Sequence, residues 1–291
     1  MRSPRRAAGV CERMNDSLRD GLRVWWDGAA DGPTNMAIDE LLAGEAVRTG
    51  GVLVRIYAWD APAVSLGAFQ SITEARSHEG LVGLPIVRRP SGGGAIVHGS
   101  DLTFAVAVPR EHRLATLPQR LYDTVHGALV AVLREWGVPA MLSEPAGTEA
   151  EDALPLSEKP GTGPLLCFDR RATGDVVIGD SEANPPRDFK VMGSAQRRLP
   201  GAVLQHGSLL LASNQAVPAS ARHRGLAELC REMGIAPPEP MGLVRDWLRR
   251  VGGGVGGGVV EEAGGAFVSA KDAAVVEAAR RFREEAWTAR R

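Results

Sequence analysis

The pattern of apolar and polar positions predicts a sheet in the middle of the chain, with helices on either side of it. The run LRVWWD at 22–27 suits a buried strand, and apolar residues at every third or fourth position predict a helix from Asp31 to about Gly50. Short β-rich runs predict further strands at 52–57, 63–67, 86–89, 95–98, 102–108, 165–168, 175–178, 189–192 and 202–211. Because strands and helices do not alternate regularly, the pattern favours an α+β fold with a mixed or mostly antiparallel sheet.

The clearest helical pattern runs from Thr116, the expected N-cap, to Trp136. The residues after Pro218 are also expected to be helical. We expect a flexible glycine-rich break at 252–258 and a last helix that begins at Ser269.

Composition excludes several classes of protein. The apolar fraction of 44% and charged fraction of 24% in 291 residues are those of an ordinary globular protein, and no apolar run approaches the ~20 residues of a membrane helix. Lys and Arg total 34 against 35 for Asp and Glu, so the net charge of -1 gives no general attraction to nucleic acid or to a membrane surface. The cysteines, Cys11, Cys167 and Cys230, are too few and scattered for a disulfide framework or a metal site, which fits a reducing, cytoplasmic setting.

A glycine-rich segment, RRPSGGG at 88–94, is expected between two strands. Three glycines without a Cβ let backbone amides come very close to a ligand, and two guanidiniums stand beside them. The segment is not a phosphate loop of the Walker type, because no Gly-Lys-Ser/Thr follows and no helix begins there. The alternative is a hairpin turn with exposed arginines. His98 beyond it either faces a ligand or is satisfied in the core, and on its own it favours the core.

Two further residues are candidates for chemistry. Cys167, in the run LLCF, is either a small buried hydrophobe or a nucleophile. Lys190 is one of only three lysines among 34 basic residues, and it lies in a β-rich, glycine-marked segment. A lysine in such a place suggests a compact charge or a group whose pKa can shift, and a surface salt bridge is the alternative.

Five segments in sequence order resemble the octanoyltransferases and ligases of the lipoate-protein ligase and biotin-protein ligase superfamily. They are NMAIDELL at 35–42, SLGAFQ at 65–70, RRPSGGGAIVH at 88–98, KVMGSAQRR at 190–198 and QHGS at 205–208. Each motif alone is weak, but the combination, from about Trp25 to about Ser213, is specific.

The resemblance implies a large, mostly antiparallel sheet with a smaller sheet and flanking helices, and an acyl tunnel lined by the glycine loop. The catalytic residues that it implies are Cys167 and Lys190. The substrate-binding residues that it implies are Arg89, Ser91, Gly92, Gly93, Gly94, His98, Gly193, Ser194, Ala195 and His206.

The position of the cysteine separates the branches of this superfamily. ATP-dependent ligases lack a nucleophilic cysteine, and one transferase branch carries it after the HisGlySer segment, where this chain reads LLLASN. Another branch carries it upstream of the motif lysine in a Cys-Phe pair, which Cys167 and Phe168 match. The resemblance therefore implies an octanoyltransferase of this second type.

The implied reaction is a two-step acyl transfer without a cofactor. Cys167 takes an octanoyl group from octanoyl-acyl carrier protein, and a lysine of an apo lipoyl domain or of the glycine-cleavage H protein then receives it. Lys190 would favour the thiolate, and backbone amides at 193–195 could stabilise the oxyanion. An ATP-dependent lipoate-protein ligase and a catalytically silent lipoyl-domain binding protein are the alternatives, and a biotin ligase fits less well because no GRGR-type segment is present.

The chain is then expected to have three parts. Residues 1–21 are an expected disordered N-terminal extension, with Met14 as an alternative start, because this stretch is Arg-rich and lacks the apolar core of a secretory signal. Residues 22–217 form the expected acyltransferase domain, and 218–291 a helical C-terminal part packed on it. The segment 143–164, rich in Glu, Pro, Gly and Thr, is expected to be a mobile surface loop.

Overall fold

The computed structural model describes residues 21–144, 164–180, 187–262 and 266–290. The expected N-terminal extension lies outside this part of the chain except for its last residue, and so does most of the segment 143–164 expected to be a loop.

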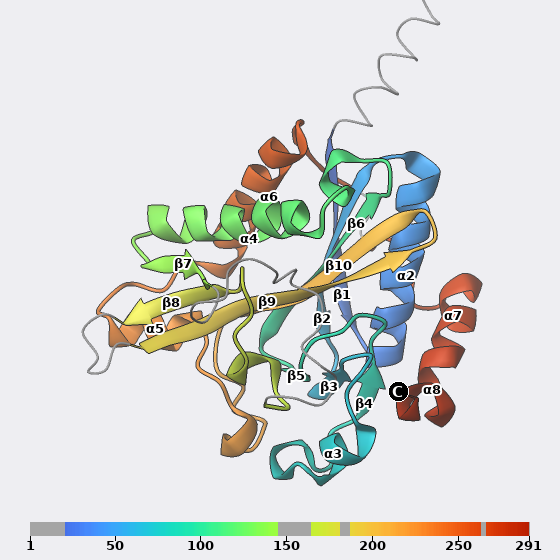
Figure 1. Ribbon diagram of the computed structural model, residues 1–291, viewed down its shortest axis with the longest axis horizontal. Coiled ribbons are helices and arrows are strands. Elements are labelled where there is room, and N and C mark those ends of the chain that lie inside the picture. Colours follow the sequence, from blue (N-terminus) through green and yellow to red (C-terminus); the bar gives the residue numbers. More distant parts are fainter. Residues whose placement is uncertain (1–20, 145–163, 181–186, 263–265, 291) are drawn as a thin grey trace, which may run out of the picture.

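A large sheet of eight strands forms the centre of the fold (Figure 1). Its order is β11-β1-β2-β6-β10-β9-β8-β7, and its pairs are antiparallel except that β1 is parallel to both β11 and β2. The strands are β1 (Leu22–Ala30), β2 (Val52–Trp59), β6 (Asp101–Pro109), β7 (Ala140–Leu142), β8 (Val176–Asp180), β9 (Arg187–Leu199), β10 (Ala202–Leu210) and β11 (Val259–Glu261).

A smaller sheet of three strands has the order β4-β3-β5. It consists of β3 (Ala63–Leu66), β4 (Ile86–Arg88) and β5 (Ile96–His98), with β3 parallel to β4 and antiparallel to β5. The glycine-rich segment connects β4 to β5, as predicted. The two sheets and the flanking helices confirm the α+β fold with a large, mostly antiparallel sheet.

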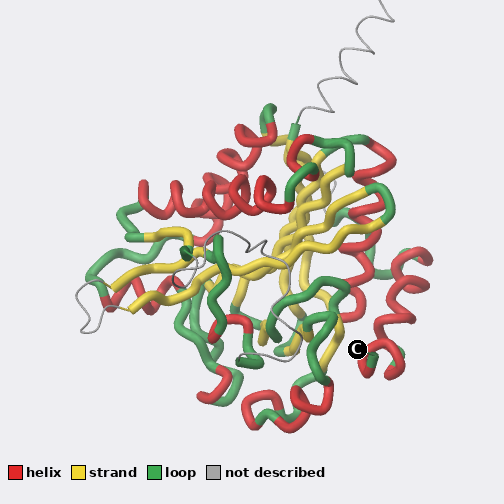
Figure 2. Tube along the Cα trace, viewed as in Figure 1, coloured by secondary structure: helices red, strands yellow, loops and turns green. Residues whose placement is uncertain are grey.

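Helices cover both faces of the large sheet (Figure 2). They are α2 (Gly32–Thr49), α3 (Ile72–Ser77), α4 (Pro118–Glu135), α5 (Leu226–Glu232), α6 (Pro240–Val255), α7 (Ala273–Arg283) and α8 (Glu285–Ala289), with short 3-10 turns at η1 (Glu79–Leu81), η2 (Arg113–Ala115), η3 (Cys167–Asp169) and η4 (Ala219–Ala221). Side chains along β2 point alternately to the two faces of the large sheet. Val52 and Val54 belong to the core beneath α4 and α6, whereas Leu53 and Tyr57 belong to the core beneath α2.

Helix α2 forms where the sequence predicts it. Asp31 is its N-cap, and the Asp31 Oδ1 accepts the Thr34 N–H at 2.9 Å. Gly50 ends the helix with a left-handed φ of 73°. Met36 and Asp39 of this helix are buried on the side of the large sheet where the pocket described below lies.

The N-cap of α4 is Leu117 and not Thr116 as predicted. Three further local predictions are wrong. The segment 165–168 is not a strand, because it forms only one isolated bridge, between Leu166 and Ala95, before the chain turns into η3. The break expected at 252–258 begins inside α6, where a Cβ on Gly252 would lie 2.7 Å from Val259 Cγ2. This glycine therefore serves close packing against β11 rather than flexibility.

The third of these further wrong predictions concerns the last long helix, which begins at Ala273 rather than at Ser269. The Ser269 N–H donates instead to the side chain of Asp272, which is the N-cap.

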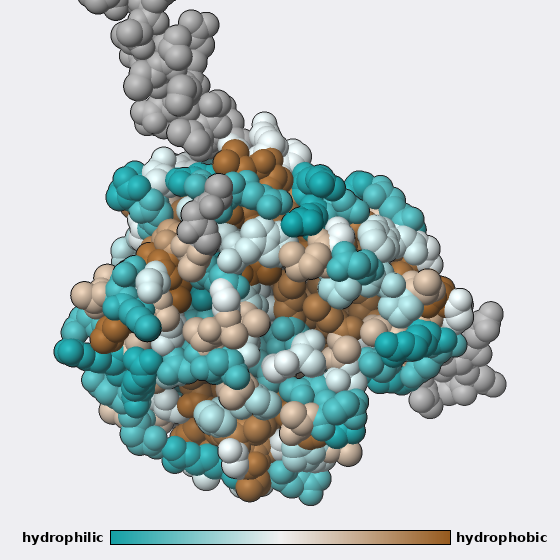
Figure 3. All heavy atoms as spheres, turned by 180° about the vertical axis from the view of Figure 1, so that it is seen from behind, coloured by the Kyte–Doolittle hydropathy of each residue, from teal (hydrophilic) through white to brown (hydrophobic). Residues whose placement is uncertain are grey.

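The surface of the molecule carries apolar side chains as separate patches between hydrophilic ones when it is seen from behind (Figure 3). Such scattered apolar exposure is ordinary for a folded protein surface. No helix in the described ranges is long and apolar enough to span a membrane.

Candidate active site

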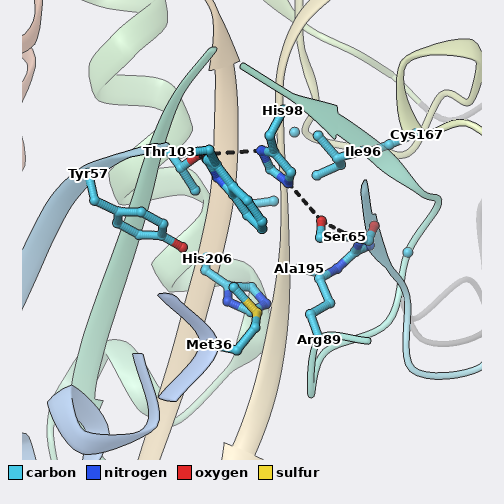
Figure 4. A pocket seen from close by; sticks show the side chains of 15 residues that line it. Met36, Tyr57, Ser65, Arg89, Ile96, His98, Thr103, Cys167, Ala195 and His206 are labelled. Atoms are coloured by element: carbon cyan, nitrogen blue, oxygen red, sulfur yellow. Dashed lines mark hydrogen bonds between the residues drawn. The ribbon is translucent and has the colours of Figure 1, made fainter. Parts of the chain in front are cut away.

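A pocket with about 400 Å³ of space, part of it open to solvent, lies between the small sheet and the face of the large sheet that α2 covers. Many of the residues predicted from the motifs line it, namely Arg89, Gly93, His98, Cys167, Gly193, Ser194, Ala195 and His206. The lining also includes residues that the motifs did not identify as binding residues, namely Met36, Tyr57, Trp59, Ser65, Ile96, Thr103 and Gly207. Figure 4 shows Cys167 at one end of this group and Tyr57 at the other.

Cys167 and Lys190, which are 23 positions apart in the sequence, meet at one end of the pocket. The Lys190 Nζ lies 3.4 Å from the Cys167 Sγ and donates to the Cys167 carbonyl at 3.1 Å. It also pairs with the Asp175 Oδ2 at 2.8 Å. Lys190 is only 6% exposed, so the alternative of a surface salt bridge is wrong.

Two neighbouring groups, the Cys167 sulfur and the Asp175 carboxylate, stabilise the positive charge of Lys190. Burial alone would lower the pKa of Lys190, but the Cys167 sulfur and the Asp175 carboxylate outweigh burial, and the pKa lies above its usual value. The ammonium is therefore protonated at neutral pH. An ammonium at this distance can stabilise a thiolate on Cys167.

The glycine loop sets the position of Cys167. A Cβ on Gly94 would lie 2.8 Å from both the Cα and the N of Cys167, so only glycine allows this approach. The Cys167 N–H donates to the Ala95 carbonyl at 2.7 Å, and the Ala95 N–H donates to the Leu165 carbonyl at 2.9 Å. Gly193 makes room on the other side, because a Cβ there would lie 2.5 Å from Lys190 Cε.

The two arginines of the loop are buried, so the alternative of a turn with exposed arginines is wrong. Arg89 donates to the carbonyls of Ser65, Gly92 and Gly94 at 2.6 to 2.7 Å, and burial lowers its pKa to about 10. Arg88 donates to the carbonyls of Gly67, Gln70 and Thr288 at 2.8 to 2.9 Å. Both guanidiniums thus hold the loop in shape, and Arg89 also lines the pocket.

His98 lies in the pocket wall with its ring fully bonded. The Ser65 Oγ lies 2.8 Å from its Nε2, and the Asp101 Oδ2 lies 2.8 Å from its Nδ1. The ring stacks on Trp59 with centroids 3.9 Å apart (Figure 4 shows the His98 contacts with Ser65 and Thr103). His98 is therefore both a satisfied buried histidine and a lining residue.

Asp101 remains an anion beside His98. Burial would raise its pKa, but His98 and the hydroxyl of Ser208, with the Gly99 N–H, outweigh burial and lower the pKa to about 2.

His206 connects the glycine loop to helix α2. Its Nε2 is hydrogen-bonded to the Ser91 Oγ, and its Nδ1 lies 3.1 Å from the Asp39 Oδ2. Tyr57 also donates to this carboxylate at 2.8 Å. Ser91 and Asp39 are 1% and 0% exposed, so Ser91 contributes to the site by fixing His206 and the loop.

A third histidine, His126 of α4, lies next to the site and was not predicted. Its Nδ1 lies 2.6 Å from the Gly174 carbonyl, which can only accept, so Nδ1 carries the hydrogen. Burial lowers the pKa of His126, so the ring is neutral at pH 7 and the Nε2 accepts the Ser194 hydroxyl at 2.7 Å. A histidine among the apolar residues of α4 was the one signal in the sequence that could have pointed to this contact.

The fold and the site together define an α+β protein with a cysteine at one end of its pocket, in contact with a buried lysine. The model of the lipoyl protein ligase A/B catalytic domain family matches residues 31–237, which is more than half of the chain. The protein belongs to this family, and the superfamily predicted from the motifs is confirmed.

Among its relatives, the octanoyltransferase LipM of Symbiobacterium thermophilum is 37% identical over 201 residues, which cover 67% of this chain and 66% of that protein. The octanoyltransferase LipM of Bacillus subtilis is 31% identical over 188 residues, which cover 63% of each chain. The chain thus spans slightly less than two thirds of the length of these curated relatives.

Solved structures show the same fold. A putative lipoate protein ligase from T. acidophilum with bound lipoic acid superimposes with a TM-score of 0.62 at 18% identity, over 92% of this chain and 99% of that one. A lipoate-protein ligase A bound with ATP gives a TM-score of 0.62 at 20% identity, over 92% and 98% of the two chains.

Proposed function

We propose that this protein transfers an octanoyl group from octanoyl-acyl carrier protein, through a thioester on Cys167, to a lysine of a lipoyl domain or of the glycine-cleavage H protein. The observation that carries this proposal is the 3.4 Å contact between the Cys167 Sγ and the buried Lys190 Nζ at the end of the pocket. The proposed substrates follow from the resemblance and from the names of the relatives, which are octanoyltransferases.

The pocket suits an acyl chain. Apolar side chains of Met36, Trp59 and Ile96 line it, and the buried polar groups of its wall are hydrogen-bonded to one another rather than left open to a ligand. An apolar chain would therefore displace water without breaking these hydrogen bonds.

In the first step, the Cys167 thiolate attacks the thioester carbonyl of the donor. A C–S bond to Cys167 forms, the C–S bond to the carrier breaks, and the carrier thiolate leaves and takes a proton from solvent. The Lys190 ammonium stabilises the attacking thiolate, and we propose that it also donates to the oxyanion. The backbone amides at 193–195 are further donors that we propose for this oxyanion.

In the second step, the amine of the acceptor lysine attacks the acyl carbonyl. A C–N bond forms, the C–S bond breaks, and the Cys167 sulfur leaves as a thiolate beside the Lys190 ammonium. The attacking nitrogen releases its proton to solvent. Neither step consumes ATP, and since the thiol must stay reduced to react, we also propose a cytoplasmic location.

The ATP-dependent ligase is the second candidate, because lipoate ligases share this fold. The cysteine in contact with the motif lysine favours the transferase. That contact also argues against a silent binding protein, since a cysteine that only fills the core needs no cationic partner.

Mass spectrometry of the intact protein tests the proposal. Incubation with octanoyl-acyl carrier protein and no nucleotide should add one octanoyl group, which hydroxylamine removes and which Cys167→Ala does not acquire. An adduct that requires ATP and free octanoate would establish the ligase instead, and no adduct under either condition would support the binding protein.

A further inference from the structure

Asp175, a residue that no motif identified, is bonded directly to the proposed catalytic lysine. Its Oδ2 lies 2.8 Å from the Lys190 Nζ. Asp175 and Lys190 are 5% and 6% exposed, so water screens their interaction little. Among the described residues, Asp175 is the carboxylate in contact with this ammonium.

The backbone around Asp175 is held on both sides, so its carboxylate has a fixed place. The Ser143 N–H donates to the Asp175 carbonyl at 2.7 Å, and the Ala172 N–H donates to the Asp175 Oδ2 at 2.8 Å. The preceding carbonyl, that of Gly174, accepts the His126 Nδ1–H at 2.6 Å. These bonds connect the turn before β8 to the residue that follows β7 and to α4, next to Lys190.

The charges around Lys190 change during the proposed reaction. When Cys167 is deprotonated for attack, two anions lie beside the ammonium, namely the Cys167 thiolate and the Asp175 carboxylate. Once Cys167 carries an acyl group, its sulfur is neutral and only the carboxylate remains. A buried ammonium without a counter-ion tends to lose its proton, because desolvation penalises the charged form.

We propose that Asp175 is a positioning residue that keeps Lys190 protonated and in place while Cys167 is acylated. This inference rests on the proposed function. In the second step, the ammonium stabilises the Cys167 thiolate as the C–S bond to the acyl group breaks and the C–N bond to the acceptor forms. Asp175 therefore acts through Lys190, and it matters more for acyl transfer than for acyl loading.

The rate of acyl loading depends less on Asp175 than the rate of acyl transfer does. Before loading, the thiolate itself pairs with Lys190, so removing the carboxylate leaves a neutral pair of one cation and one anion. Before transfer, removing the carboxylate leaves an ammonium with no anion beside it, so a neutral lysine becomes the favoured form. A neutral amine cannot provide the positive charge that the departing sulfur needs.

The test measures the two half-reactions separately in Asp175→Asn, which keeps the size of the side chain and removes its charge. Loading is followed as the octanoyl adduct on the enzyme, and transfer is followed by adding apo lipoyl domain to isolated acyl-enzyme. We expect loading to slow by no more than roughly threefold and transfer to slow by roughly 100-fold, a typical size for one positioned group. The loss should lie in the maximal rate of transfer and not in the acceptor concentration for half-saturation.

Asp169→Asn is the matched control. This carboxylate follows Cys167 in the same η3 turn but pairs with His223 at 2.9 Å and is 49% exposed. The same chemical change there should alter neither half-reaction by more than about twofold, as expected for an exposed pair. Asp175→Glu, which restores the charge on a longer side chain, should recover part of the transfer rate.

Two results would overturn the inference. An equal slowing of loading and transfer in Asp175→Asn would mean that the carboxylate supports the site as a whole, and unchanged transfer would mean that Lys190 does not depend on it. If Asp175→Asn fails to fold, the same two rates in Asp175→Ala, which also removes the charge, decide the question, because no selective slowing of transfer there contradicts the proposed charge balance. Failure of the wild-type protein to form an adduct would instead contradict the proposed function.

Discussion

Replacing Gly94 with alanine adds one methyl group where the glycine loop meets the proposed nucleophile. The new Cβ would lie 2.8 Å from the N and the Cα of Cys167 and 3.1 Å from the Arg170 Cδ. The Arg170 side chain can move, but the Cys167 atoms belong to the backbone. Because the Cys167 N–H is bonded to the Ala95 carbonyl at 2.7 Å, the backbone cannot retreat without stretching that hydrogen bond.

The expected size of the effect follows from these distances. Carbon atoms in good contact lie about 3.5 to 4.0 Å apart, so Cys167 must move by roughly 1 Å. A displacement of that size at a reacting group costs about 100-fold in rate. The strain of one extra methyl group in a packed site costs about 1 to 3 kcal/mol in the free energy of unfolding, which corresponds to a fall in Tm of roughly 2 to 6 °C.

Gly92 was predicted to bind substrate but does not line the pocket, so Gly92→Ala provides the control within the same loop. Its Cβ would lie 3.7 Å from the Phe69 ring, an ordinary van der Waals distance, so we expect loading within about twofold of wild type. Both variants are compared by the rate of octanoyl loading and by thermal unfolding. Near-normal loading in Gly94→Ala, or an equal loss in Gly92→Ala, would show that the loop does not set the position of Cys167.

Two further predictions concern buried charges. Lys190→Arg should fold but lose at least about 10-fold in octanoyl transfer, because a planar guanidinium cannot replace a compact ammonium between Cys167 and Asp175; transfer at the wild-type rate would remove Lys190 from the mechanism. Asp101 has its pKa lowered to about 2, against burial, by His98 and by hydrogen bonds, so it contributes about 2 kcal/mol to folding above about pH 4, and this is lost as the pH falls through 2. The difference in unfolding free energy between wild type and Asp101→Asn, measured by urea denaturation, should therefore shrink from pH 5 to pH 2, and a constant difference would contradict the lowered pKa.

Much of the fold could be predicted from local patterns, and the wrong predictions have a common cause. Helix α2 was predicted with both of its ends because Asp31 and Gly50 are local signals. Strand β11 was not predicted, since it is short, and only its pairing with β1 identifies it. In the same way, the apolar run that contains Cys167 looks like a strand, yet the backbone has only Ala95 to pair with before it turns.

The site shows the same division between local and long-range information. The glycine loop could be predicted to approach a ligand closely, and it does line the pocket, but its closest approach in the structure is to Cys167 through Gly94. Nothing in the spacing of the sequence indicates that contact, since the two residues are joined by a segment of more than 70 positions. The motif resemblance identified both Gly94 and Cys167 as site residues. The structure shows why position 94 must be glycine.

Asp175 and His126 show why part of the site could not be predicted. An aspartate at the start of a strand and a histidine within a helix are both ordinary residues in sequence, and each becomes informative only through its partner. The role of the Asp175 carboxylate depends on its contact with Lys190. The role of the His126 imidazole depends on its bond to the carbonyl of Gly174, the residue before Asp175. A lysine that must stay cationic in a buried place requires an anion that does not take part in the chemistry. The sequence could suggest only that Lys190 carries a functional charge, and the structure was needed to identify Asp175 as the carboxylate beside it.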